Sequence, residues 1–209
     1  TFMSQNVPTH TVGIGSGSPL VNGASQNVTY AASKDTNSQT IITDGWTNST
    51  TAIVKAGDVL KFAGCFAVNP VTKATLSHLK EFVVLADANS GSSTGPATIT
   101  ISPAMIISGA FQNASAVPLN NAVITLKGTG AGLYPMNMMF TKNAFALVSV
   151  PLVSPPGAVD VSRQSYKGTN VRVIPVYDGT NDKSTWRLDV LYGVKCIDER
   201  QAVRVSGTA

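Results

Sequence analysis

Short extended runs recur along the middle of this 209-residue chain, between two glycine-rich segments at residues 13–17 and 128–132. In residues 97–102, apolar and hydroxyl side chains alternate, so Ile99 and Ile101 share one face of a predicted strand. Further runs at similar spacing, separated by Gly, Pro and Asn turns, predict a small barrel or sandwich. No long amphipathic helix is evident, which makes the chain mainly β.

Other segments qualify this prediction. Residues 82–86 form a continuous apolar run, which predicts a buried strand, whereas residues 136–147 fit either a short helix or a buried strand. We therefore expect an α+β chain, mainly β with some α. Proline follows each glycine-rich segment closely, at Pro19 and Pro135, so neither segment starts the helix that a phosphate-binding glycine loop needs. Both segments are predicted to be flexible linkers.

The composition of the chain limits the classes of function that it can have. Charged residues make up 12% of the chain, against about 25% in ordinary globular domains. The net charge of +4 is scattered rather than clustered as in nucleic-acid binding modules. The longest apolar stretch, residues 143–153, is too short and broken to span a bilayer, so we expect no membrane partner. The two cysteines, Cys65 and Cys196, are expected to be reduced, mostly buried thiols. No signal peptide is visible, and we expect the chain to be a piece of a longer polypeptide.

The residues for catalysis and metal binding are few. The chain has two histidines, His10 and His78, and both are predicted to be structural or surface residues. The cysteines and histidines lack metal-ligand spacing, so we expect no metal, no cofactor and no enzymatic activity. Residues 178–182 superficially resemble a calcium loop, but Asp-Gly and Asn-Asp pairs favour a hairpin turn.

The last fifty residues predict a hairpin, with a strand at 171–177, a loop at 178–183 and a return strand at 186–193. The apolar face of the return strand consists of Trp186, Leu188, Val190 and Tyr192. That face is predicted to pack on a core. Arg187 and Asp189 share the opposite face, where we expect them to meet a neighbouring strand or subunit.

One alternative to a structural role remains open from the residues. A β-sandwich that binds carbohydrate or a host surface would present aromatic side chains for stacking on sugars. The candidates for this role are Tyr30, Trp46 and Trp186.

Several blocks in order resemble a family of phage coat proteins. Residues 2–13 are similar to a Q-N-x-P-T-H-T-x-G signature, and residues 57–64 and 67–73 resemble the next blocks. Residues 162–168 and 181–193 resemble the C-terminal block. The family comprises the major capsid proteins of short-tailed double-stranded DNA phages that carry an insertion domain. The resemblance covers nearly the whole chain and corresponds to the C-terminal half of such a subunit.

The resemblance implies a Hong Kong 97-type capsid core interrupted by a β-barrel insertion domain. Residues 1–18 would be a core strand and linker, residues 19–128 the insertion domain, and residues 129–209 a segment of the axial and peripheral core. It implies a non-enzymatic shell subunit that self-assembles in the bacterial cytoplasm and resides in the virion. Scaffolding and portal proteins and non-specifically held packaged DNA would be its partners. We predict subunit contacts at Arg172, Arg187 and Asp189.

Overall fold

The computed structural model describes residues 7–158, 160–198 and 201–207, so part of the predicted first core strand lies outside the described residues. The chain divides into two compact units. One comprises the chain up to Met136 together with the stretch from Ser206 on, and the other comprises Asn137–Val205.

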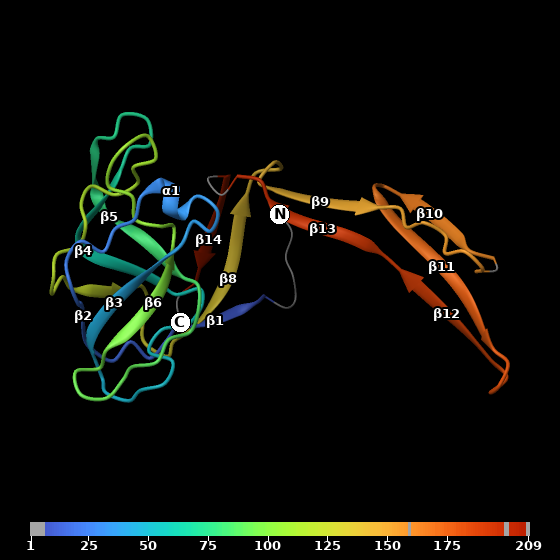
Figure 1. The fold of residues 1–209 in the computed structure, drawn as a ribbon, viewed down its shortest axis with the longest axis horizontal. Helices are drawn as coiled ribbons and strands as arrows, with labels where there is room; N and C mark the ends of the chain where they lie inside the picture. The colour runs from blue at the N-terminus through green and yellow to red at the C-terminus, as the bar shows by residue number, and fades with distance from the viewer. Residues whose placement is uncertain (1–6, 159, 199–200, 208–209) are drawn as a thin grey trace. The chain divides into compact units, whose positions relative to one another are not determined.

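The first unit contains a six-stranded antiparallel sheet in the order β2-β3-β6-β5-β4-β7 (Figure 1). Its strands are β2 (Gly17–Val21), β3 (Gln39–Trp46), β4 (Val59–Val68), β5 (Thr75–Val84), β6 (Ala97–Ser102) and β7 (Ile124–Leu126). The two edges of this sheet approach each other, because Leu20 forms a bridge with Val123 and the Val21 amide donates to the Ala122 carbonyl. The sheet therefore curls into a nearly closed barrel.

Apolar side chains at alternate positions along the strands form the core of the barrel. Ile99 and Ile101 are buried on one face of β6, as predicted, and Ile41 pairs with Ile99 across β3 and β6. The predicted strand at 82–86 forms the end of β5 and the residues after it, but only alternate side chains are covered: Val83 and Leu85 are exposed. The largest fully buried side chains are Phe62, Phe82, Ile41, Ile53, Leu60, Ile99, Ile101 and Met105.

Helix is almost absent from the part of the chain that the structure describes. α1 (Tyr30–Ser33) has four residues, and the Thr29 side chain makes no capping hydrogen bond to it. Residues 136–147, which fit helix or strand, belong to the strands β8 (Leu133–Phe140) and β9 (Phe145–Val150). The described residues thus form a mostly β chain, and the α component of the expected class is limited to one turn.

The prediction that the glycine-rich segments are flexible is wrong. Their backbones pack closely: a Cβ at Gly130 would lie 2.1 Å from the Ile14 carbonyl oxygen, and one at Gly13 would lie 2.5 Å from the Val54 Cα. The Ala131 amide donates to the Gly13 carbonyl at 3.1 Å. Glycine serves here for close approach of backbones rather than for freedom of motion.

The chain segments on either side of the barrel pair with each other. β1 (Thr9–Thr11) runs antiparallel to β8, with His10 opposite Tyr134. β8 also pairs with β14 (Ala202–Ser206), which gives a three-stranded sheet in the order β1-β8-β14.

The second unit is built from long, thinly covered strands. β9 pairs with β13 (Leu191–Cys196), and a separate sheet has the order β10-β11-β12. Its strands are β10 (Ser162–Tyr166), β11 (Thr169–Asp178) and β12 (Lys183–Asp189). The predicted hairpin is confirmed by the β11–β12 register, but the return strand is interrupted at Val190, and the residues that follow pair with β9.

Both cysteines are free thiols. Cys65 is buried, and this burial raises the pKa of its thiol to about 11, so it carries no thiolate at neutral pH. Cys196 is half-buried.

Candidate contact surface of the second unit

The β11–β12 hairpin presents two chemically different faces. Side chains at paired positions of antiparallel strands share a face. Arg172 lies opposite Asp189, which places these two residues on the same face as Arg187. Trp186 lies opposite Pro175, and Leu188 lies opposite Val173, so the other face is apolar.

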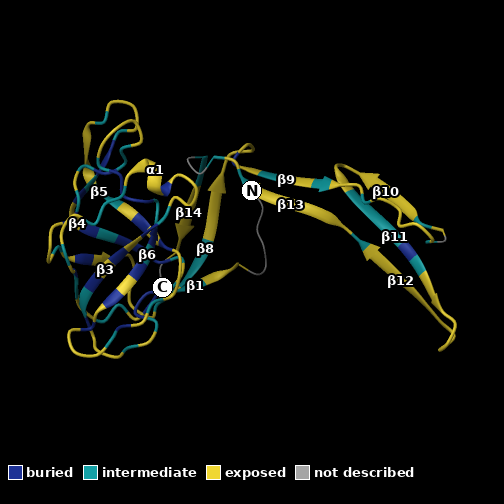
Figure 2. Cartoon of the chain, in the orientation of Figure 1, coloured by how far each residue is buried: buried dark blue, intermediate teal, exposed yellow. Residues whose placement is uncertain are grey.

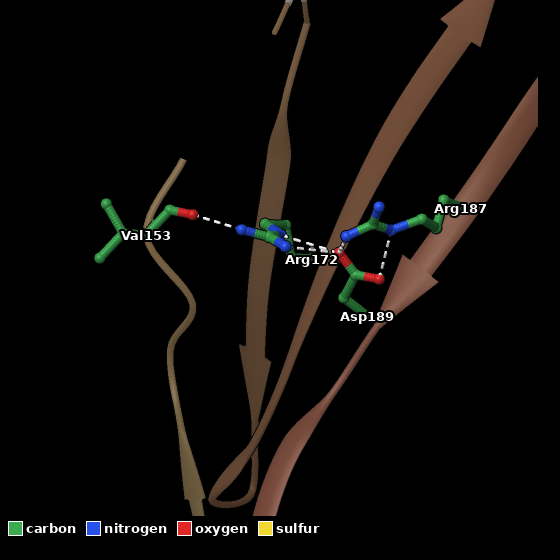
Figure 3. Close-up of polar contacts among 4 residues, drawn as sticks. All are labelled: Val153, Arg172, Arg187 and Asp189. Carbon is green, nitrogen blue, oxygen red and sulfur yellow. Dashed lines mark hydrogen bonds and ion pairs between the residues drawn. The ribbon is translucent and has the colours of Figure 1, made fainter. Parts of the chain in front are cut away.

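The polar face holds a carboxylate between two guanidinium groups (Figure 3). Arg172 donates from Nη2 and Nε to Asp189 Oδ2, at 2.5 and 3.1 Å. Arg187 donates from Nε to Oδ1 at 2.7 Å and from Nη2 to Oδ2 at 2.9 Å. A further nitrogen of Arg172 donates to the Val153 carbonyl. Asp189 thus meets Arg172 of the neighbouring strand β11, as expected, whereas Arg187 hydrogen-bonds to Asp189 on its own strand.

The three charged residues differ in how accessible their side chains are to another molecule. The side chains of Arg172 and Asp189 are 11% and 17% exposed, whereas that of Arg187 is 62% exposed. Both oxygens of Asp189 are already occupied within the chain. Of the three residues predicted as subunit contacts, Arg187 is thus the one whose guanidinium is accessible, and the other two hold it in position.

The two arginines should make Asp189 unusually acidic. The hydrogen bonds from Arg187, followed by those from Arg172, lower the pKa of the Asp189 carboxyl from 3.8 to about 2. A lowered folded-state pKa stabilises the fold above about pH 4, and this contribution is lost as the pH falls through 2. We expect the Asp189 side-chain carbon to titrate near pH 2 in an NMR pH series, with Asp189→Asn used for assignment.

A variant of Arg187 provides the control for this titration. Arg187→Ala removes the larger cause of the shift, so the Asp189 midpoint should rise toward its ordinary value. A midpoint near 3.8 in the unaltered protein would show that the cluster does not form in solution.

The apolar face is not covered, contrary to prediction. Trp186 is 65% exposed and Leu188 is 69% exposed, so most of each side chain is open to solvent. β9 and β13 are likewise largely exposed (Figure 2). Alternation identified which side chains share a face, but the layer that covers a face is set by other segments. Contiguous exposed apolar strands are typical of surfaces that contact other protein.

The other residues considered for catalysis or metal binding in the sequence have structural or surface roles. His10 donates to Asp58, in agreement with a hydrogen-bonded structural histidine, and His78 is exposed on β5. Within the described ranges, no three His, Cys, Asp or Glu side chains gather as a metal site would require. The hairpin turn at 178–182 is confirmed, because Asp178 accepts hydrogen bonds from the Thr180 amide and the Asn181 side chain.

The three aromatic candidates for sugar stacking are dispersed. Trp46 is buried in the barrel and donates its indole N–H to Thr43, so it is not accessible for stacking on a sugar as the carbohydrate-binding alternative requires. Tyr30 is exposed but already stacks on Phe111 at 3.6 Å between ring centroids. Trp186 is exposed on β12. Among the helical residues that the structure describes, none form a helix long enough to cross a membrane.

Comparisons with known proteins are consistent with one another. The sequence model of the family described as "P22 coat protein - gene protein 5" matches residues 1–206. A major capsid protein of Acyrthosiphon pisum secondary endosymbiont phage 1 is 29% identical over 180 residues, which cover 82% of this chain and 42% of that relative. The solved CUS-3 coat protein I-domain is 27% identical, with a TM-score of 0.36, and the match covers 54% of this chain and 96% of that domain. The chain thus spans less than half the length of its curated relative.

Proposed function

Because this chain belongs to the P22 coat protein family, we propose that it is part of a phage major capsid subunit. In this role, identical subunits assemble into the icosahedral shell that encloses the phage DNA. The observation that carries the proposal is the family match over residues 1–206, nearly the whole chain. The exposed apolar strands of the second unit support it, because a shell subunit works through extended contacts between protein surfaces.

We also propose how the chain divides into domains. The barrel strands β2 to β7 lie within residues 17–126, which supports residues 19–128 as an insertion domain. Residues 1–18 and 129–209 would then belong to a Hong Kong 97-type core. The pairing of β1 with β8 supports this assignment, since it brings the two ends of the proposed insertion together.

The proposed role defines the partners and the location. Copies of the same subunit would be the main partners, with scaffolding and portal proteins during assembly in the bacterial cytoplasm and packaged DNA inside the finished virion. The subunit would act without catalysis, as a structural protein of the shell. Arg187, held by Asp189 and Arg172, would form contacts between subunits, because its guanidinium is the accessible one of the cluster.

Electron microscopy of the full-length product of the gene that contains this segment tests the proposal. The product should be expressed alone and with its neighbouring genes, and closed shells are the expected result. A uniform small particle under both conditions would overturn the capsid role and direct attention to binding functions.

Two variants extend this experiment to the contact surface. Arg187→Ala should reduce the yield of closed shells while the subunit remains folded. Lys183→Ala removes a positive charge from the same strand outside the cluster and should leave the yield unchanged. Equal yields from both variants and the unaltered protein would exclude Arg187 as a subunit contact.

A further inference from the structure

A buried carboxylate lies where the barrel meets the chain that leads into it. The Asp58 side chain is fully buried, at the turn that precedes β4. Its Oδ1 accepts a hydrogen bond from His10 Nε2 at 2.6 Å, and its Oδ2 accepts from the Gly13 amide at 3.0 Å and the Lys55 amide at 2.7 Å. A buried carboxylate is costly unless its oxygens are satisfied, and here three donors satisfy it.

Two of these donors come from outside the barrel. We use the term neck for residues 9–15 and 129–136, the segments through which the chain enters and leaves the barrel. His10 and Gly13 belong to the neck, whereas the Lys55 amide belongs to the same turn as Asp58. The backbone of Asp58 is anchored in the barrel, because its carbonyl accepts the Val84 amide at 2.8 Å. One residue thus connects the barrel to the neck.

The neck makes other contacts that depend on this position. The Ile14 and Gly15 amides donate to the carbonyls of Ala52 and Ile53, and the Val12 amide donates to the Gly132 carbonyl. These bonds require Gly13 to approach the backbone of Val54 closely. The Asp58 carboxylate accepts a hydrogen bond from the Gly13 amide at this point of closest approach.

We propose that His10 and Asp58 form a latch that holds the neck against the barrel and fixes the direction in which the chain enters it. His10 is a positioning residue in this device, because it acts through the buried carboxylate. The latch concerns the barrel and its neck alone, so it does not depend on the proposed assembly into shells.

The position of the latch predicts that opening it leaves the barrel intact. The hydrophobic core cluster is formed by residues such as Ile41, Phe62 and Phe82, and it includes no residue of β1. His10 is at the margin, with a side chain 17% exposed. Loss of its imidazole should therefore loosen the neck selectively.

Amide hydrogen exchange of the 209-residue chain, followed by NMR, tests the latch. In His10→Ala, the Val12, Gly13 and Ala131 amides should exchange about tenfold faster or more, since a hydrogen bond to a charged group is lost. The amides of β3 and β6, inside the barrel, should keep their rates. His10→Gln should largely restore protection, because its side-chain amide can donate to Asp58 from a similar distance.

His78→Ala is the matched control, since it removes a histidine that is exposed on β5. It should leave the exchange rates of the neck unchanged. Unchanged neck rates in His10→Ala would overturn the latch. A rise of equal size in the neck and in β3 and β6 would also overturn it, because it would show that His10 contributes to global stability and not to the position of the neck. If the subunit failed to assemble into shells, the interpretation of these exchange rates would not change.

Discussion

Gly130→Ala is expected to weaken the packing of the neck strongly, although it adds a single methyl group. The new Cβ would lie 2.1 Å from the Ile14 carbonyl oxygen and 3.0 Å from the Ile14 carbonyl carbon. Both atoms belong to the backbone, which cannot move aside as a side chain can. Overpacking typically costs about 1–3 kcal/mol, and contact with rigid backbone places this variant at about 3 kcal/mol of free energy lost from the packed neck.

Amide hydrogen exchange of the neck measures this loss, and the two tryptophans provide a separate readout of the barrel. Trp46 is buried in the barrel and Trp186 is exposed in the second unit, so Trp186→Phe leaves a protein whose indole fluorescence reports on the barrel. In that background, Gly130→Ala should speed the exchange of the Val12 and Ala131 amides by about a hundredfold, whereas the urea midpoint of the barrel should change little. Gly193→Ala is the control, because its Cβ would have no atom within 4 Å. Equal exchange rates of these amides in the two variants would show that the neck segments do not pack as described.

The local pattern of residues predicted the strands better than it predicted their surroundings. Alternation placed Ile99 and Ile101 on one face, and the barrel covers that face. The same reasoning grouped Trp186 with Leu188, but both side chains are mostly exposed. Alternation reveals which side chains share a face, whereas burial depends on segments distant in sequence or on other molecules.

The contacts of the latch and the neck could not be predicted from the sequence. Asp58 directly precedes β4, and no local pattern connects it with His10, which lies 48 positions away. Glycine-rich stretches are found both in loose linkers and where backbones approach closely, so Gly13 and Gly130 could not be assigned to the second class without the structure. The resemblance of ordered blocks, rather than composition, predicted the family that the comparison confirmed.

Phe62→Ala should give the other large loss of stability. Phe62 is fully buried on β4, and its ring meets that of Phe82 edge-to-face, with 5.4 Å between the ring centroids. Removing a buried phenyl group loses its transfer free energy and leaves a cavity that the sheet cannot fully close. Such deletions cost about 3–5 kcal/mol of unfolding free energy.

Phe111→Ala is a control of the same chemistry in an exposed place. Phe111 is 54% exposed and stacks on Tyr30, so its loss should cost about 1 kcal/mol or less. Urea unfolding followed by Trp46 fluorescence in the Trp186→Phe background compares the two variants directly. Losses of similar size would mean that the barrel interior is loosely packed, because only a well-packed core distinguishes a buried phenyl group from an exposed one. A loss several times larger for Phe62→Ala is the expected result, since β4 and β5 meet at this aromatic pair.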